Sequence, residues 1–430
     1  MSLLARRDLL KLGVALTTGA SLPRLLCAAE RDAAFDWTLH PPESVGMSRN
    51  GLEKVRAAIQ KSIDDKSIPG AVTAIARHNR LVWYEAQGVR DVDAGTPMGK
   101  DDIFRMMSSS KPVVAVAVLI LLDEGKLSVD DNVSRFLPTF KDPKVAIGPR
   151  GTKDAAKVTL VPAEREITIK DLLTHTSGLM SSGDLNGSPP AALVNKIERK
   201  PDDTLADYIP RLGAAALDFQ PGTKWSYSPL AGFDVLLRIV EIASGQPADQ
   251  FLRERIFEPL HMRDTFFNVP PEKQSRVVDI YGPDRTVQKH LLGEGPWTYF
   301  SGAGGLFSSV HDYMQLEAML LNRGTLNGRT LLEPETVALM TRNHVGTLFA
   351  EWIPFVTSGH GFGLGVRIVQ DAAKGGGRGV GAFGWGGAYG TETWADPTFD
   401  LVAALFVQTQ PAPANVRNDF ERALRKAIVD

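Results

Sequence analysis

Residues 103–122 read IFRMMSSSKPVVAVAVLILL, a serine-rich turn followed by an unbroken apolar run. Because proline lacks an amide hydrogen, Pro112 fits only in the first turn of a helix, which predicts that the helix begins at about Ser108. The apolar run is too short to cross a bilayer, shows no polar face and is followed by Gly125, a residue typical of helix ends. The stretch therefore predicts a central buried helix around which the fold is organised.

Ser108 and Lys111 form a Ser-x-x-Lys pair at the start of this helix. Residues three apart share one helix face, so the hydroxyl and the amine can meet. The positive end of the helix dipole favours an alkoxide-like oxygen there, and burial favours a neutral amine that can act as a base. The alternative is an exposed lysine beside a serine-rich cap, since such a pair occurs by chance about once in a chain of this composition.

Composition excludes several classes of protein. The content of 43% hydrophobic and 23% charged residues is that of a soluble globular protein, and a net charge of -2 without a basic block argues against nucleic acid as a partner. The single cysteine, Cys27, lies in the N-terminal segment that is expected to be removed. The mature chain is therefore expected to lack disulfides, a cysteine nucleophile and thiolate metal sites.

The N-terminal segment is similar to a twin-arginine export signal. Arg6 and Arg7 precede a weakly hydrophobic stretch at residues 12–22, and small residues at 27–29 form a cleavage site. We expect cleavage after Ala29, a periplasmic or secreted location and no stable membrane insertion. An amphipathic N-terminal helix is the alternative.

Hydrophobic periodicity predicts an α+β fold. Strand-like runs come from both ends of the chain, at residues 71–77, 81–88, 361–370, 379–384, 391–396 and 400–409. Helical patterns occupy residues 50–64, 230–244, 248–257, 309–323, 334–343 and 418–429. Short turns between successive strands predict an antiparallel sheet that is discontinuous in sequence, with a mostly helical region inserted into it. The predicted boundaries are 1–29 for the export signal, 30–105 with 295–430 for the sheet domain, and 106–294 for the helical domain.

Two further stretches are candidates for a cleft. Ser228 and Pro229 resemble the N-cap and first residue of a helix, which places Tyr227 just before it, although a lone tyrosine is more often a packing residue. Residues 383–388 read FGWGGA, and glycines in a strand mark the close approach of another backbone or a ligand. This strand could edge a cleft and offer a free amide, or it could be a glycine-rich bend with Trp385 in the core.

The remaining motifs argue against a metal site. His175, in the segment LLTHTSGL, is interpreted as a structural hydrogen-bonding residue. The sequence contains no H-x-x-x-H pair and no G-x-S-x-G nucleophile elbow. We expect no metal and no cofactor.

Taken in order from Trp37 to the C-terminus, these stretches resemble the serine beta-lactamase and penicillin-binding-protein superfamily. The resemblance is to its class C-like branch with the family VIII carboxylesterases, and it includes residues 124–131 and 173–179. It implies an antiparallel sheet flanked by helices beside a mostly helical domain, with the site between them. It makes Ser108 the nucleophile and Lys111 its partner, while Tyr227 matches the tyrosine of the Y-x-N element.

The same resemblance matches Trp385, Gly386 and Gly387 to the substrate-binding K-T-G strand. It places the oxyanion between the backbone amides of Ser108 and Ala388. Two positions depart from the family pattern, because Pro229 replaces the asparagine of Y-x-N and Trp385 replaces the lysine of K-T-G. The second change resembles the W-G-G variant of family VIII esterases.

These residues lead to one expected function and several alternatives. We expect an exported enzyme that hydrolyses short-chain carboxylic esters through an acyl-enzyme at Ser108. Its substrates are therefore expected to be small molecules. On the same site, beta-lactam or peptide hydrolysis and acyl transfer to an alcohol are alternatives, and Arg367 or Arg378 could then replace the missing lysine. A non-catalytic cell-wall-binding module is the alternative of another class.

Overall fold

The computed structural model describes residues 34–149, 152, 154–180, 197, 199–228, 231–291, 293 and 295–429. The predicted export signal and Pro229 lie outside these residues. The described sheet and helical regions belong to one unit, Asp32–Asp430. The predicted boundaries between a sheet domain and a helical domain stay a prediction.

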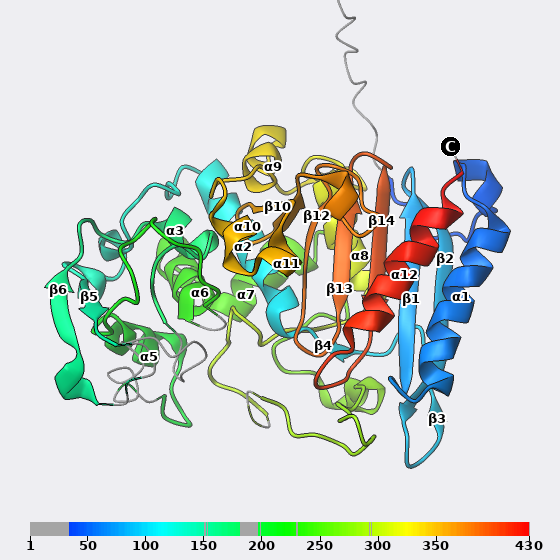
Figure 1. Ribbon diagram of the computed structural model, residues 1–430, viewed down its shortest axis with the longest axis horizontal. Coiled ribbons are helices and arrows are strands. Elements are labelled where there is room, and N and C mark those ends of the chain that lie inside the picture. The colour runs from blue at the N-terminus through cyan, green and yellow to red at the C-terminus, as the bar shows by residue number, and fades with distance from the viewer. Residues whose placement is uncertain are drawn as a thin grey trace, which may run out of the picture. The chain divides into compact units, whose positions relative to one another are not determined.

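The main sheet is antiparallel and is built from both ends of the chain (Figure 1). Strand β1, from the N-terminal part, pairs with β14, from the C-terminal part, with Val72 opposite Phe406 and Arg77 opposite Leu401. The strand order is β10-β11-β12-β13-β14-β1-β2-β3. The bounds are β1 Gly70–Arg77, β2 Arg80–Asp91, β3 Thr96–Pro97, β10 His360–Phe362, β11 Arg367–Val369, β12 Phe383–Gly386, β13 Glu392–Asp396 and β14 Leu401–Phe406.

Two predicted strands differ from the observed ones. The run 361–370 forms two strands, β10 and β11, because Gly365 turns the backbone with a φ of 81° and the Gly363 amide donates to the Val366 carbonyl at 2.8 Å. The predicted strand 379–384 begins only at Phe383 and continues to Gly386. The expected antiparallel arrangement is confirmed.

Helices cover both faces of this sheet (Figure 1). Alternate residues of β1 point to opposite faces, so Ile75 joins the core under α1 (Arg49–Asp64) and α12 (Ala414–Ala427) while Ala74 joins the core that contains α8 (Val310–Leu321). Gly51 lets α1 and α12 pack closely, because a Cβ on it would lie 2.5 Å from the Cα of Ala427.

The predicted central helix is α2 (Ser110–Asp123), preceded by the 3-10 turn Met107–Ser109. Every residue from Ser110 to Leu121 is buried, which confirms the prediction, and Gly125 follows the helix with a φ of 67°. Pro112 is the third residue of α2, where its missing amide hydrogen removes no helix hydrogen bond.

Shorter elements complete the fold. The predicted helix 248–257 is α7 (Ala248–Leu252) continued by the π-helical turn Arg253–Phe257, and the last helix begins at Ala414, earlier than predicted. The other helices are α3 Ile169–Leu173, α5 Leu205–Leu212, α6 Ala231–Ser244, α9 Pro334–Met340, α10 Leu348–Trp352 and α11 Pro354–Thr357. Two-stranded ribbons pair β4 Phe104–Arg105 with β7 Phe307–Ser308, β5 Lys144–Ile147 with β6 Thr159–Pro162, and β8 Thr325–Leu326 with β9 Arg329–Thr330. Among the described residues, no helix has the length and apolar character that a membrane span requires.

Candidate active site

The half-buried Ser108 hydroxyl lies between the side chains of Lys111 and Tyr227. Lys111 Nζ donates to Ser108 Oγ at 3.2 Å, and the Tyr227 hydroxyl donates to the same oxygen at 2.5 Å. The Ser108–Lys111 contact follows from their spacing across the start of α2, whereas Tyr227 is 119 residues away in sequence. The structure thus brings together the three residues that the sequence predicted as the reacting groups.

Lys111 is held by backbone as well as by Ser108. Its side chain is 1% exposed, and its Nζ donates to the Ala303 carbonyl at 2.7 Å and lies 5.0 Å from the centre of the Tyr227 ring. Two proton-carrying groups therefore converge on one half-buried hydroxyl, and one of them, Lys111, is itself buried. Such an arrangement can accept the serine proton and return it to a leaving group.

His175 fixes the segment that carries Tyr227. The His175 carbonyl accepts from the Ser226 amide at 3.0 Å, and His175 Nδ1 accepts from the Ser228 amide at 3.4 Å. Burial, and secondarily the nearby charge of Lys111, lowers the pKa of His175 well below its usual value, so the ring is neutral and Nδ1 is free to accept. This confirms the interpretation of His175 as a structural hydrogen-bonding residue.

The predicted helix start at Ser228 is seen only in part. Ser228 Oγ accepts from the Gly232 amide at 3.4 Å, and α6 is described from Ala231. Pro229 lies outside the described residues, so the position that corresponds to the family asparagine has no structural account.

Glycines let β12 lie close to β13 and let the turn after β12 approach the nucleophile segment. A Cβ on Gly387 would lie 2.3 Å from the Met106 carbonyl oxygen, and a Cβ on Gly384 would lie 2.2 Å from the Thr393 carbonyl oxygen of β13. These contacts confirm that the glycines mark close backbone approach. Gly386 likewise faces Glu392, whose Oε2 would lie 2.2 Å from an added Cβ.

Thr391 ties the turn that carries Ala388 to the segment that carries Ser108. Its hydroxyl donates to the Met106 carbonyl at 3.2 Å and shares a hydrogen bond with Ser109 Oγ at 3.0 Å. Ala388 is exposed, and its amide has no hydrogen-bond acceptor among the described residues. The Ser108 amide lies in the first helical turn, where amides have no acceptor within the helix. Both amides therefore suit the predicted oxyanion site.

An aromatic wall borders the three polar groups. We use this name for the half-buried rings of Tyr227, Trp352 and Trp385, because the Tyr227 ring centre lies 5.6 Å from that of Trp385 and 6.5 Å from that of Trp352. Trp385 comes from β12 and Trp352 from α10. Buried rings of Trp225, Phe349 and Phe362 pack behind the wall.

Neither arginine that could replace the missing K-T-G lysine is available to a substrate. Arg378, buried, donates to Glu392 and to Glu421 at 2.6 Å each, and Arg367 lies 3.4 Å from Glu392. Burial alone would raise the pKa of Glu392, but the Arg378 guanidinium beside it lowers that pKa to about 2. Both cations are therefore engaged by a carboxylate that stays ionised.

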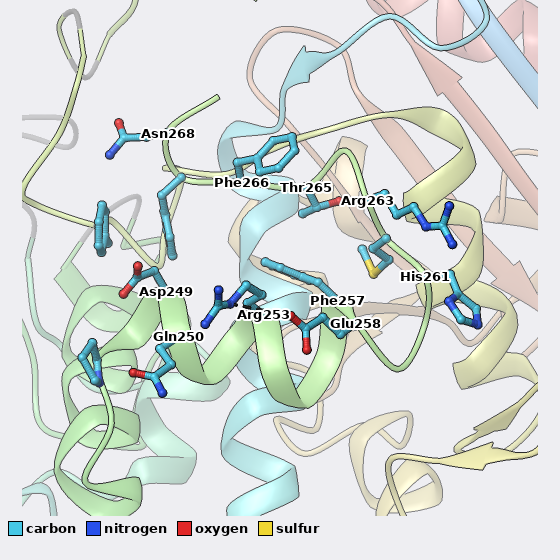
Figure 2. Close-up of a pocket in the computed structure, with 14 residues that line it drawn as sticks. Asp249, Gln250, Arg253, Phe257, Glu258, His261, Arg263, Thr265, Phe266 and Asn268 are labelled. Carbon is cyan, nitrogen blue, oxygen red and sulfur yellow. Dashed lines mark ion pairs between the residues drawn. The ribbon is translucent and has the colours of Figure 1, made fainter. Parts of the chain in front are cut away.

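A separate hollow of about 750 Å³ lies between α7 and residues 261–268 (Figure 2). Phe257, Phe267 and Phe300 line it together with charged side chains such as Arg253 and Glu258. None of the predicted site residues lines it. In the described part of the chain, no group of three or more His, Cys, Asp or Glu side chains is placed to hold a metal ion.

Sequence reasoning missed three features of the site. The Ala303 carbonyl has no side-chain signature, Trp352 belongs to a segment without a motif, and Thr391 acts across 285 residues on Met106. The predicted substrate-binding residues Trp385, Gly386 and Gly387 lie together at the end of β12 and the start of the following turn.

Comparison with known proteins finds a family model and relatives that match most of this chain. The family model described as Beta-lactamase matches residues 55–427. Esterase EstB of Burkholderia gladioli is 32% identical over 401 residues, which cover 87% of this chain and 94% of that protein. Lovastatin esterase of Penicillium rubens is 31% identical over 398 residues, which cover 86% of this chain and 96% of that protein. The solved structure of EstCE1, a hydrolase with promiscuous acyltransferase activity, superposes with a TM-score of 0.72 at 27% identity, covering 88% of this chain and 99% of that one.

Proposed function

This chain belongs to the Beta-lactamase family, and we propose that it is an exported serine hydrolase that cleaves short-chain carboxylic esters through an acyl-enzyme at Ser108. Family membership and esterase relatives make it a carboxylesterase-like serine hydrolase. The observation that carries the finer proposal is the pair of hydrogen bonds, from Lys111 and from Tyr227, that meet at the Ser108 oxygen.

The proposed reaction has two halves. Ser108 Oγ attacks the ester carbonyl carbon while its proton passes to the Lys111–Tyr227 pair, and the amides of Ser108 and Ala388 stabilise the oxyanion. The tetrahedral intermediate collapses, the C–O bond to the alcohol breaks, and the pair returns the proton to the leaving oxygen. Water then attacks the carbonyl carbon of the acyl-enzyme while the pair takes a proton from it. The bond to Ser108 Oγ breaks, the pair returns the proton to this oxygen, and the acid is released.

The charges and rings around Ser108 support an ester over a beta-lactam. A beta-lactam brings a carboxylate, and an unpaired buried charge costs several kcal/mol. Trp385 supplies no charge, and Arg367 and Arg378 are engaged by Glu392. An ester brings an uncharged carbonyl, and the aromatic wall can cover its apolar part at about 25 cal/mol per Å² removed from water.

The test compares substrates and one substitution at Trp385. We expect kcat/KM for nitrophenyl esters of two to eight carbons to exceed that for a chromogenic cephalosporin and to peak at short chains. Trp385→Lys should move the ester-to-cephalosporin ratio toward the cephalosporin. The matched control is Leu39→Lys, which adds the same charge at a side chain that is 62% exposed and should leave the ratio unchanged. A wild type that prefers the cephalosporin, or a ratio that Trp385→Lys does not move, contradicts the proposed substrate class.

Acyl transfer to an alcohol is a second candidate on the same site. It is favoured by the likeness to EstCE1 and by the aromatic wall, which offers an apolar surface for an acceptor beside Ser108. Adding a primary alcohol to the ester assay separates the two reactions, because transfer produces a new ester and hydrolysis produces the free acid.

Export is proposed from the sequence of residues 1–29 alone. We propose a twin-arginine signal cleaved after Ala29, which gives a periplasmic or secreted enzyme. Mass spectrometry of protein from the native host should find an N-terminus at Glu30. An intact Met1 terminus on the exported protein would contradict the cleavage.

A further inference from the structure

Asp234 is a buried carboxylate that the reaction above does not use. It lies on α6, is 3% exposed, and accepts three hydrogen bonds. The Tyr299 hydroxyl donates to Oδ2 at 2.7 Å, while the Ser301 hydroxyl and the Ala303 amide donate to Oδ1 at 2.8 and 3.0 Å. A buried carboxylate is stable only when it is paired or hydrogen-bonded, and these three donors supply the hydrogen bonds that Asp234 needs.

The turn that Asp234 binds is also fixed by packing. A Cβ on Gly302 would lie 2.6 Å from the Phe233 carbonyl oxygen and 2.9 Å from Leu237 Cβ, so this glycine lets the turn lie directly on α6. The Ser301 carbonyl accepts from the Gly305 amide at 2.8 Å, which closes the turn. Residues 301–305 therefore have little freedom as long as Asp234 holds them.

The far side of this turn reaches the nucleophile. The Ala303 carbonyl, on the same residue whose amide is bound by Asp234, accepts from Lys111 Nζ at 2.7 Å. Lys111 Nζ in turn donates to Ser108 Oγ. We propose that Asp234 is a positioning residue, which holds the Ala303 carbonyl where it aims the Lys111 amine at the Ser108 oxygen.

Electrostatics supports the same assignment. Burial raises the pKa of Asp234, and the three hydrogen bonds together with the charge of Lys111 act in the opposite direction. Asp234 is therefore coupled to Lys111 electrostatically as well as through the amide and carbonyl of Ala303. The proposal rests on the proposed function, because it assigns Asp234 a role only through Lys111 and Ser108.

Asp234→Ala is the first test. Loss of the carboxylate should loosen the turn and lower kcat by about ten- to a hundredfold, the range expected when a reacting group is misplaced by up to 1 Å, while KM changes less than about threefold. Asp234→Asn keeps an acceptor for the Ala303 amide and should retain more activity than the alanine variant. An unchanged kcat in folded Asp234→Ala would overturn the proposal.

A double-mutant cycle with Lys111 separates positioning from simple loss of structure. In a Lys111→Ala background no amine remains to be aimed, so adding Asp234→Ala should change kcat by less than about twofold. Equal losses in the two backgrounds would overturn the proposal. If Asp234→Ala fails to fold, Ser301→Ala removes one of the three hydrogen bonds and should show the same dependence on Lys111 with a smaller loss.

Asp312 provides a matched control. It is an aspartate on α8, 2% exposed, that accepts from the Asp264 amide at 2.6 Å and from the Thr265 hydroxyl at 2.9 Å. Asp312→Ala should lower the melting temperature and leave kcat per folded molecule within about twofold. The proposed function is tested separately: turnover that survives Ser108→Ala refutes the function itself, whereas an inactive Ser108→Ala with additive Asp234 and Lys111 losses refutes only the role of Asp234.

Discussion

Gly387→Ala tests whether the turn after β12 supplies part of the oxyanion site. The added Cβ would lie 2.3 Å from both the Met106 carbonyl oxygen and Thr391 Oγ1, whereas real Cβ contacts essentially never fall below 3.0 Å. One of the neighbours must therefore move. The clashing Met106 atom is a backbone oxygen two residues before Ser108, and Thr391 is hydrogen-bonded to Ser109 and Met106. Because both neighbours are held in place, the turn with Ala388 should shift away from Ser108.

The expected loss follows from the role of the Ala388 amide. Removal of one oxyanion donor costs about 10²- to 10³-fold in kcat, or about 2.7–4 kcal/mol of transition-state stabilisation. Crowding should also lower the free energy of unfolding by about 1–3 kcal/mol. KM should change much less, because the uncharged ester carbonyl binds these amides weakly before it becomes an oxyanion.

The assay measures kcat with a four-carbon nitrophenyl ester and unfolding in urea. The control is Gly232→Ala on α6, where an added Cβ would find nothing closer than the Leu172 carbonyl oxygen at 3.7 Å. That variant should keep full activity and gain up to about 1 kcal/mol in stability, the usual benefit of alanine over glycine in a helix. A folded Gly387→Ala enzyme with kcat within about twofold of wild type would show that this turn does not supply an oxyanion donor.

The remaining predictions concern the proton-transfer pair and a buried acid. Lys111→Ala and Tyr227→Phe should each lower kcat by at least about a hundredfold, with a double mutant far from additive if the two act as a unit; fully additive losses would show that they do separate jobs. Burial raises the pKa of Glu317 on α8 to about 7, above its usual 4.5, so the folded state binds the extra proton in this range. The contribution of this proton to the free energy of unfolding is fully present below pH 4.5 and is lost as the pH rises through 7. From pH 4 to pH 8 the free energy of unfolding of wild type should therefore fall by up to about 3 kcal/mol more than that of Glu317→Gln, as measured by urea unfolding. The same pH dependence in both proteins would contradict this.

The sequence predicted those parts of the site that depend on local spacing. Ser108 and Lys111 meet because three residues span one turn at the start of α2, and that helix is buried because its residues are apolar on every side. Only the order of motifs along the chain, which resembles that of the family, predicts that Tyr227 joins them. The split of residues 361–370 into two strands depends on the turn at Gly365, which a strand-like composition conceals.

The remaining parts depend on tertiary packing. Ala303 contributes a carbonyl oxygen, which every residue has, and Asp234 differs from other aspartates only in what surrounds it after folding. Trp352 reaches Tyr227 because α10 packs beside β10 (Figure 1), and Trp352 and Phe362 of β10 both contact Trp225, two residues before Tyr227. No spacing rule connects such residues, because their contacts are made by elements far apart in the sequence.

If Ser108 forms a covalent acyl-enzyme, a probe that traps the nucleophile will reveal it in the mass of the modified protein. A fluorophosphonate ester should add one adduct to the folded wild-type chain, and tandem mass spectrometry of its peptides should place that adduct on Ser108. Labelling should fall with Lys111→Ala and disappear with Ser108→Ala, while the latter variant keeps its melting temperature within a few degrees because only a small half-buried hydroxyl is lost. An adduct on another residue, or one that persists in folded Ser108→Ala, would show that Ser108 is not the nucleophile.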